Sequence, residues 1–259
     1  MSATAIYVYC VVRGAKSLAP ARVPHGLPGS SAASLVPLSP SVSLVVAEVP
    51  LELYGAEKLE PALRDLDWVG TVAVAHEAVV EYFVRQSGVT VIPMKLFTMF
   101  SSRARAAAEM KRRLRELEQV FARLRGCEEW GVRVAGRREA PRTKRPPGVA
   151  ASGTAFLTAR KRARDQARED IRLAAEAAEA AYDVLAAHAR DSRRRDDVPD
   201  AASAPPLLDA AFLIPASSRA RFRAATRRAA AACAQAGAAM TVSGPWPAYN
   251  FVDAQREAL

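Results

Sequence analysis

The sequence predicts an α+β protein with two domains. Its 259 residues exceed the usual size of one domain. Half of them are hydrophobic and a quarter are charged, a globular composition that excludes wholesale disorder, collagen-like repeats and a disulfide-stapled miniprotein. Short strand-like runs alternate with helical patterns on both sides of Gly126. We therefore expect domains at 1–125 and 126–259, the first ending in a long amphipathic helix.

Two apolar runs in the first domain predict buried strands. Residues 6–12 (IYVYCVV) consist almost entirely of the β-branched and aromatic side chains that favour strands, and residues 42–49 (VSLVVAEV) form a second, valine-rich run that Pro50 ends. Five prolines lie between the two runs and interrupt regular structure, so we expect an extended loop there.

Helical periodicity dominates the rest of the first domain. A short helix is expected at 59–66, and the run 69–86 places His76 on the apolar face of a helix. A short strand is expected at 89–92. After a cap at Ser101-Ser102, one long helix is predicted, because apolar residues recur every three or four positions at Met110, Leu114, Leu117, Phe121 and Leu124.

The second domain is expected to be a small sheet covered on one side by helices, because strands and helices alternate. The expected strands are 129–135, 207–214 and 240–243, and the expected helices are 153–189 and 219–236. The polar segment 191–204 is interpreted as a linker. The buried stripe of the first helix is predicted to be Ile171, Ala174, Ala178, Tyr182 and Leu185.

The net charge of +10 is unevenly distributed. Residues 101–150 carry 14 basic and 6 acidic side chains, and part of this excess lies in a proline-containing basic loop at 136–152. Such a loop neutralises phosphates in nucleic-acid-binding proteins, so a basic nucleic-acid-associated protein is the main alternative function. The loop has no aromatic residue for base stacking, and no known nucleic-acid-binding motif accompanies it. We therefore favour a solvated charged surface as the explanation of the charge.

No catalytic, cofactor-binding or metal site is predicted, so we expect no enzyme. The histidines at 25, 76 and 188 are isolated, and no zincin, phosphate-loop or nucleophile-elbow pattern is present. We interpret His76 as a buried structural histidine whose ring nitrogens find hydrogen-bond partners. An enzyme assembled from distant residues would need a deep polar pocket containing His76 and a perturbed carboxylate such as Glu77.

The cysteines and the hydropathy favour a cytoplasmic protein that does not associate with a membrane. Cys10, Cys127 and Cys233 are scattered and show no CxxC spacing, so disulfides are not expected. We expect neither a signal peptide nor a membrane-spanning helix, because the apolar stretches are short or interrupted by charges.

Six proline- and aromatic-rich motifs resemble, in their order and spacing, those of the gas vesicle GvpF/GvpL family. They are GLPG at 26–29, DLDWVGTVAVAHEAVV at 65–80, VIPMKLFTMF at 91–100, CEEWGVRV at 127–134, SGTAFL at 152–157 and SGPWPAYNFV at 243–252. The resemblance covers nearly the whole chain. One departure is in the P-x-R-F-G-T segment of the family, where this chain has Lys95, Leu96 and Phe97 in place of arginine, phenylalanine and glycine.

The resemblance implies a non-enzymatic accessory or minor structural protein of gas vesicle assembly. It implies a distinctive N-terminal α/β domain, a modified ferredoxin-like C-terminal domain, and binding to the small hydrophobic shell protein and other vesicle proteins. The cytoplasm and the gas vesicle are the implied locations, with the gas-facing side of the shell as a candidate. The motifs do not separate F-type from L-type members and leave the oligomeric state open.

The C-terminal Pro/aromatic tail is the candidate partner-binding segment. Trp246, Tyr249 and Phe251 lie among prolines, whose rigidity lowers the ordering cost of binding. Packing of the same residues onto the protein's own core is the interpretation that we favour, because buried aromatic residues usually serve packing.

Overall fold

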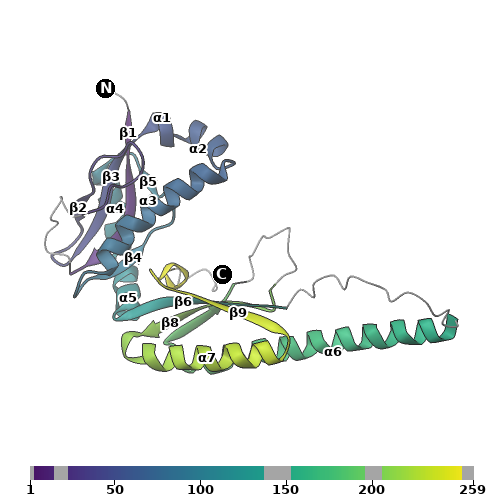
Figure 1. Ribbon diagram of the computed structural model, residues 1–259. Coiled ribbons are helices and arrows are strands. Elements are labelled where there is room, and N and C mark those ends of the chain that lie inside the picture. Colours follow the sequence, from purple (N-terminus) through teal and green to yellow (C-terminus); the bar gives the residue numbers. More distant parts are fainter. Residues whose placement is uncertain (1–2, 15–22, 137–152, 196–205, 253–259) are drawn as a thin grey trace. The chain divides into compact units, whose positions relative to one another are not determined.

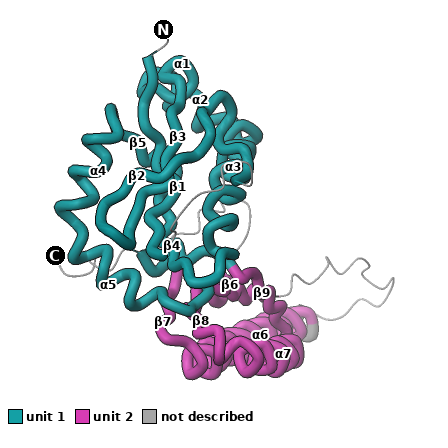
Figure 2. Tube along the Cα trace, turned by 90° about the vertical axis from the view of Figure 1, so that its left-hand side faces the viewer, with its two compact units in different colours: residues 1–128, 246–259 teal, residues 129–245 magenta. Residues whose placement is uncertain are grey.

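The computed structural model describes residues 3–14, 23–136, 153–195 and 206–252 (Figure 1). The basic loop lies outside these residues except for Gly136, so nothing is learned about its predicted role. The chain divides into two compact units, Met1–Glu128 with Trp246–Leu259, and Glu129–Pro245 (Figure 2). The mixed helix and sheet composition confirms the α+β class.

The terminal segment belongs to the first unit, which corrects its expected place in the second domain. Tyr249 Oη donates a hydrogen bond to Glu77 Oε2 at 2.7 Å, and the Phe251 side chain is fully buried. The sequence pattern could not show this placement, because the two hydrogen-bonded residues are 172 positions apart.

The first unit is built on an antiparallel sheet with the strand order β2-β3-β1-β4, and β5 also pairs with β1. Helix α3 covers one face of this sheet, and α4 and α5 lie on the other (Figure 2). The elements are β1 Thr4–Arg13, β2 Ser34–Pro37, β3 Val42–Pro50, α1 Leu51–Tyr54, α2 Ala56–Ala62, α3 Leu66–Val84, β4 Thr90–Pro93, β5 Met99–Phe100, α4 Arg103–Arg112, α5 Leu114–Leu124 and the 3-10 turn η3 Tyr249–Phe251.

A bulge in β1 shapes the core beneath α3. Val8 pairs with Val46 and Cys10 with Val45, which leaves Tyr9 as an extra residue. The bulge interrupts the alternation of side chains between the two faces of the sheet. The consecutive residues Tyr9 and Cys10 therefore both belong to the core cluster that includes the buried residues of α3. Because both faces of the sheet are covered, the strand is buried from Ala5 to Val12.

Three elements of the first unit differ from the sequence expectation. The predicted loop between the first two strands contains β2, which pairs with β3. The short helix predicted at 59–66 corresponds to α2, which begins and ends a few residues earlier, and it is preceded by α1, which was not predicted. The single long helix predicted after Ser102 is broken at Arg113 into α4 and α5. Its predicted start holds, since Ser102 Oγ accepts from Arg105 N at 3.1 Å.

The second unit has the ferredoxin-like βαββαβ order, with its strands arranged β7-β8-β6-β9. Its elements are β6 Cys127–Gly136, α6 Gly153–Ala186, β7 Asp191–Arg194, β8 Leu208–Pro215, the 3-10 turn η2 Ala216–Ser218, α7 Arg219–Gln235 and β9 Ala238–Trp246. Helices α6 and α7 pack on each other and on β8, and their core cluster includes Trp130, Phe212 and Phe222.

Two expectations for the second unit are corrected. The segment interpreted as a linker begins with β7, a polar edge strand that pairs antiparallel with β8 and so lacks an apolar signature. Arg195 follows it and forms an ion pair with the buried Asp209. Ile171 was expected in the buried stripe of α6 but is 63% exposed, and among the described residues the burial of this helix begins only at Ala174.

Candidate functional site

His76 is buried on the inner face of α3, as its helical position predicts. It is 2% exposed, and its Nδ1 lies 2.8 Å from Tyr7 Oη. Burial lowers the pKa of His76 to about 4, an effect that the Met94 backbone partly offsets. The ring is therefore neutral at physiological pH. Its Nδ1 has the expected partner in Tyr7, but its Nε2 is buried and has no hydrogen-bond partner among the described residues, so the expectation is met for one of the two ring nitrogens.

Glu77, the next residue of α3, connects the helix to the C-terminal tail. Burial raises the pKa of its carboxyl group, and the hydrogen bond from Tyr249 opposes this shift. The pKa of Tyr249 is in turn raised, first by burial and then by its bond to Glu77. This interaction fixes the tail to the helix that carries His76.

The segment after β4 is held against the same helix. Thr98 Oγ1 donates to the Lys95 carbonyl at 2.7 Å, and Phe97 N donates to Tyr7 Oη at 3.4 Å. Phe97 has a left-handed backbone with φ of 62°, a conformation that favours glycine. The GvpF/GvpL pattern has glycine at this position, and here the phenylalanine ring stacks on Trp68.

The GLPG turn is fixed to the same core by two tyrosines. Tyr9 Oη accepts from Leu27 N at 3.0 Å, and Tyr54 Oη donates to the Pro28 carbonyl at 3.0 Å. A Cβ atom on Gly26 would lie 2.0 Å from Tyr9 Oη, so the close approach requires glycine. Four of the six motifs, those at 26–29, 65–80, 91–100 and 243–252, therefore contribute residues to this unit.

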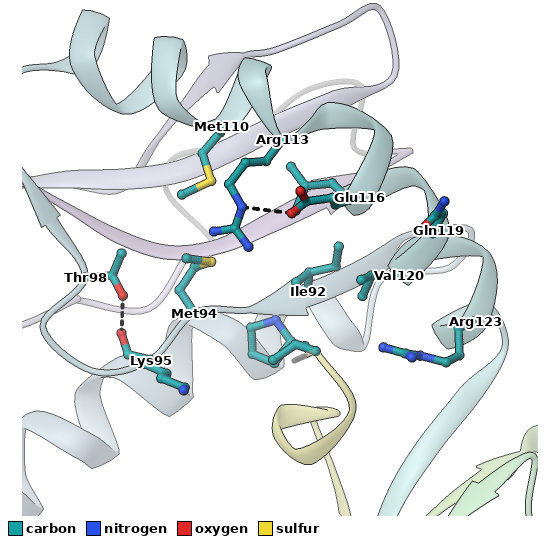
Figure 3. A pocket seen from close by; sticks show the side chains of 13 residues that line it. Ile92, Met94, Lys95, Thr98, Met110, Arg113, Glu116, Gln119, Val120 and Arg123 are labelled. Atoms are coloured by element: carbon teal, nitrogen blue, oxygen red, sulfur yellow. Dashed lines mark hydrogen bonds and ion pairs between the residues drawn. The ribbon is translucent and has the colours of Figure 1, made fainter. Parts of the chain in front are cut away.

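A groove of about 540 Å³, which we call the α5 groove, opens beside these motifs on the first unit. Figure 3 shows that its lining side chains come from β4, the segment after β4, and helices α4 and α5. Val252 adds a contribution from the tail. The lining residues are Ile92, Pro93, Met94, Lys95, Thr98, Met110, Arg113, Glu116, Leu117, Gln119, Val120, Arg123 and Val252.

The α5 groove combines an apolar floor with a mainly basic rim. Ile92, Leu117 and Val120 are buried apolar residues of its lining. Arg113 Nε lies 3.1 Å from Glu116 Oε2 (Figure 3). The Arg123 guanidinium donates to the Phe251 carbonyl. This combination suits an apolar polypeptide segment with an acidic group. The sequence did not identify the groove, although its 91–100 motif supplies one wall.

The predicted tail residues have different environments. Trp246 is 43% exposed, Tyr249 is partly buried and bonded to Glu77, and Phe251 is fully buried. The burial of Phe251 agrees with packing onto the protein's own core, the role that we weighed against partner binding. The side chain of Trp246 is the one that solvent reaches most readily.

Side chains that could bind a metal or act in catalysis are dispersed in the described part of the chain. Within it, no three His, Cys, Asp or Glu residues are grouped in a way that would hold a metal ion. The lining of the α5 groove includes neither His76 nor Glu77. The three cysteines are free thiols, and burial raises the pKa of Cys10 and Cys233. Across the same described residues, no helix has the length and hydropathy needed to span a bilayer.

A family comparison decides the identity of the chain. The sequence model of the family described as gas vesicle synthesis protein GvpL/GvpF matches residues 5–253. The chain belongs to the GvpL/GvpF family. The resemblance inferred from the six motifs is thereby confirmed. Membership supports a role in gas vesicle assembly, and GvpL/GvpF is a gas vesicle family and not a known enzyme family.

Individual relatives agree with this assignment. Gas vesicle protein L of Streptomyces sp. (strain CB03234) is 29% identical over 268 aligned positions, which cover 97% of this chain and 94% of the relative. The crystal structure of GvpF from Anabaena sp. PCC7120 has the same fold, with a TM-score of 0.65, 14% identity and 96% of each chain covered. GvpF from Microcystis aeruginosa matches with a TM-score of 0.58 and 15% identity, covering 96% of this chain and 98% of that one.

Proposed function

We propose that this GvpL/GvpF member is a non-enzymatic accessory or minor structural protein that binds the small hydrophobic shell protein and other vesicle proteins during assembly. It acts in the cytoplasm and on the gas vesicle, with the gas-facing side of the shell as a candidate location. An unassembled shell protein exposes apolar surface and is prone to aggregate, so a partner that covers this surface keeps it competent for assembly.

The α5 groove is the observation that carries this proposal. Its size and apolar floor accommodate a few side chains of an extended or helical segment. Three basic side chains and one acidic side chain line it, which favours a segment carrying a carboxylate. Exposed Trp246 is proposed as a second contact, while Tyr249 and Phe251 anchor the tail that places Val252 in the groove lining.

Co-purification with the shell protein tests this function. The full chain, tagged and co-expressed with the shell protein, should retain it, and Lys95→Glu combined with Arg113→Glu should reduce retention at least tenfold. Lys111→Glu is the matched control, because Lys111 is an exposed residue of α4 outside the groove lining. Trp246→Ala tests the tail contact separately.

Binding of the same protein to bulk DNA distinguishes the nucleic-acid alternative from the assembly role. Retention on bulk DNA that falls steeply between two salt concentrations, without capture of the shell protein, would reject the assembly role in favour of the alternative. Deletion of the gene in a vesicle-forming host should abolish cell flotation, and the wild-type gene should restore it.

A further inference from the structure

The amino-terminal part of α6 has no packing partner within the described residues of the second unit. Towards its end, α6 is buried along Ala174, Ala178, Ala181 and Leu185. From Phe156 to Leu173, every residue is exposed. Helix α7 ends at Gln235, and Cys233 Sγ lies 3.8 Å from the Ala177 carbonyl, close to the point where α6 becomes exposed. Figure 1 shows α6 continuing well beyond α7.

The exposed part continues the apolar stripe that is buried further along the same helix. Ala163, Ala167 and Ile171 precede Ala174 at helical spacing, and Phe156 lies two turns before Ala163 on the same face. Phe156 is 61% and Ile171 63% exposed. The small alanine side chains permit close approach of a second helix, as Ala174 and Ala178 do in the part of the stripe that packs in the unit.

Unpaired positive charge lies along this stripe. Arg160 lies within the stripe, Arg164 lies at its border and Arg168 lies further round the helix, while Asp170 lies at the opposite border and accepts from Gln166 Nε2. None of these arginines forms an ion pair with another described residue, whereas Arg172 on the same helix pairs with both Glu169 and Glu176. Residues 156–173 carry six basic and three acidic side chains, so charge complementarity favours an acidic partner over a second copy of the same helix.

We propose that residues 156–173 of α6 form a docking surface for an amphipathic helix of another protein, one whose carboxylates flank a narrow apolar face. The partner helix would continue along α6 from the point where α7 ends. This inference goes beyond the proposed function, because the α5 groove lies on the first unit and this surface lies on the second.

Two synthetic helical peptides test the proposal. Both have 21 residues and the same alanine and leucine stripe, and they carry either glutamate or lysine on both sides of it. In fluorescence anisotropy with the full chain, the glutamate peptide should bind at least tenfold more tightly than the lysine peptide. Amide exchange over 156–173 should slow when the glutamate peptide is added.

Charge-reversal variants locate the interaction. Arg160→Glu combined with Arg164→Glu and Arg168→Glu should weaken binding of the glutamate peptide at least tenfold. Arg162→Glu is the matched control, since Arg162 is exposed on the opposite side of the helix and should leave affinity unchanged. Circular dichroism checks that both variants remain folded.

Three outcomes would overturn the proposal. They are equal affinity for the two peptides, no binding of the glutamate peptide, and unchanged affinity in the triple variant. Vesicles of phosphatidylcholine and phosphatidylserine at a 3:1 ratio provide a membrane arm. Slowed exchange over 156–173 with these vesicles but not with the glutamate peptide would assign the surface to a membrane instead. Sedimentation showing self-association that the triple variant abolishes would assign it to a second copy.

Discussion

Phe97 stacks on Trp68, with ring centroids 5.8 Å apart and ring planes 2° from parallel. The stacking connects the segment after β4 to the first turn of α3. It occurs although Phe97 has a φ of 62°, which costs a residue with a Cβ about 1–2 kcal/mol relative to glycine. The aromatic contact therefore offsets an unfavourable backbone conformation.

This balance predicts an unusual order of stability for two truncations. Both Phe97→Ala and Phe97→Gly lose the stacking, but only the glycine variant relieves the backbone strain, so it should be about 1 kcal/mol more stable than the alanine variant. Urea denaturation gives the free energies of unfolding. Exposed Val74 in α3 is the control position, where Val74→Ala should be more stable than Val74→Gly because alanine favours a helix. If the alanine variant is more stable than the glycine variant at both positions, the backbone of Phe97 is not strained.

A pair of glycine substitutions tests the close approach at the GLPG turn. Gly26→Ala places a methyl group against Tyr9 Oη and should destabilise the first unit by about 2 kcal/mol or more. Gly70→Ala is the control, because a Cβ there meets no atom within 4 Å and alanine favours the helix. It should stabilise by about 0.5–1 kcal/mol. Thermal melts of both variants measure the difference, and equal shifts would contradict the packing.

The strands and helices with strong apolar patterns could be predicted from the sequence, and those defined by tertiary pairing could not. β1 has a continuous β-branched and aromatic run, β3 is valine-rich, and α3 and α7 have clear apolar faces. β7 is a polar edge strand, recognisable only from its pairing with β8. The apolar spacing continues through the helix break at Arg113, and the apolar run of β1 continues through the bulge at Tyr9. The sequence pattern therefore showed neither irregularity.

The candidate site was predictable as motifs but not as a surface. His76 was placed correctly on a buried helical face, because periodicity fixes which side of a helix is apolar. Its partner Tyr7 is 69 residues away, and no local pattern relates the two. The α5 groove combines side chains of four segments with Val252, so its existence depends on how the elements pack. Ile171 continues a buried stripe in sequence but lies beyond the end of that packing.

The buried His76 predicts a specific loss of stability in acid. Its folded pKa of about 4 is below the ordinary 6.5, so the unfolded chain binds more protons between these values. The stability contribution is present above pH 6.5 and is lost as the pH falls towards 4. The difference between the folded and unfolded pKa values of His76 corresponds to about 3 kcal/mol in the free energy of unfolding.

Urea titrations at intervals from pH 7 to pH 4 measure this contribution. His76→Gln keeps a group that can bond to Tyr7 but does not titrate there, so its stability should fall less steeply than that of the wild type. His25→Gln removes an exposed imidazole and is the control. Parallel profiles for the wild type and His76→Gln would contradict burial of a neutral ring.

The hydrogen bond between Tyr249 and Glu77 predicts a change with the opposite dependence on pH. Tyr249→Phe removes the donor to a largely buried carboxylate and should lower the free energy of unfolding by about 1–3 kcal/mol at pH 7. The pKa of Glu77 is already raised by burial, and loss of the donor should raise it further. The unfavourable charge disappears when the group is protonated, so the destabilisation should be smaller at pH 5 than at pH 7.

A double-mutant cycle separates this bond from general packing of the tail. Glu77→Gln removes the charge, so Tyr249→Phe should cost less in that background than in the wild type. Tyr82→Phe is the control, because no hydrogen bond of the Tyr82 hydroxyl is found among the described residues, and it should change stability by less than about 0.5 kcal/mol. If Tyr249→Phe has the same effect in both backgrounds, the ring alone holds the tail to α3. A reduced effect means that the tail, and with it Val252 at the α5 groove, is held by a charge-assisted hydrogen bond.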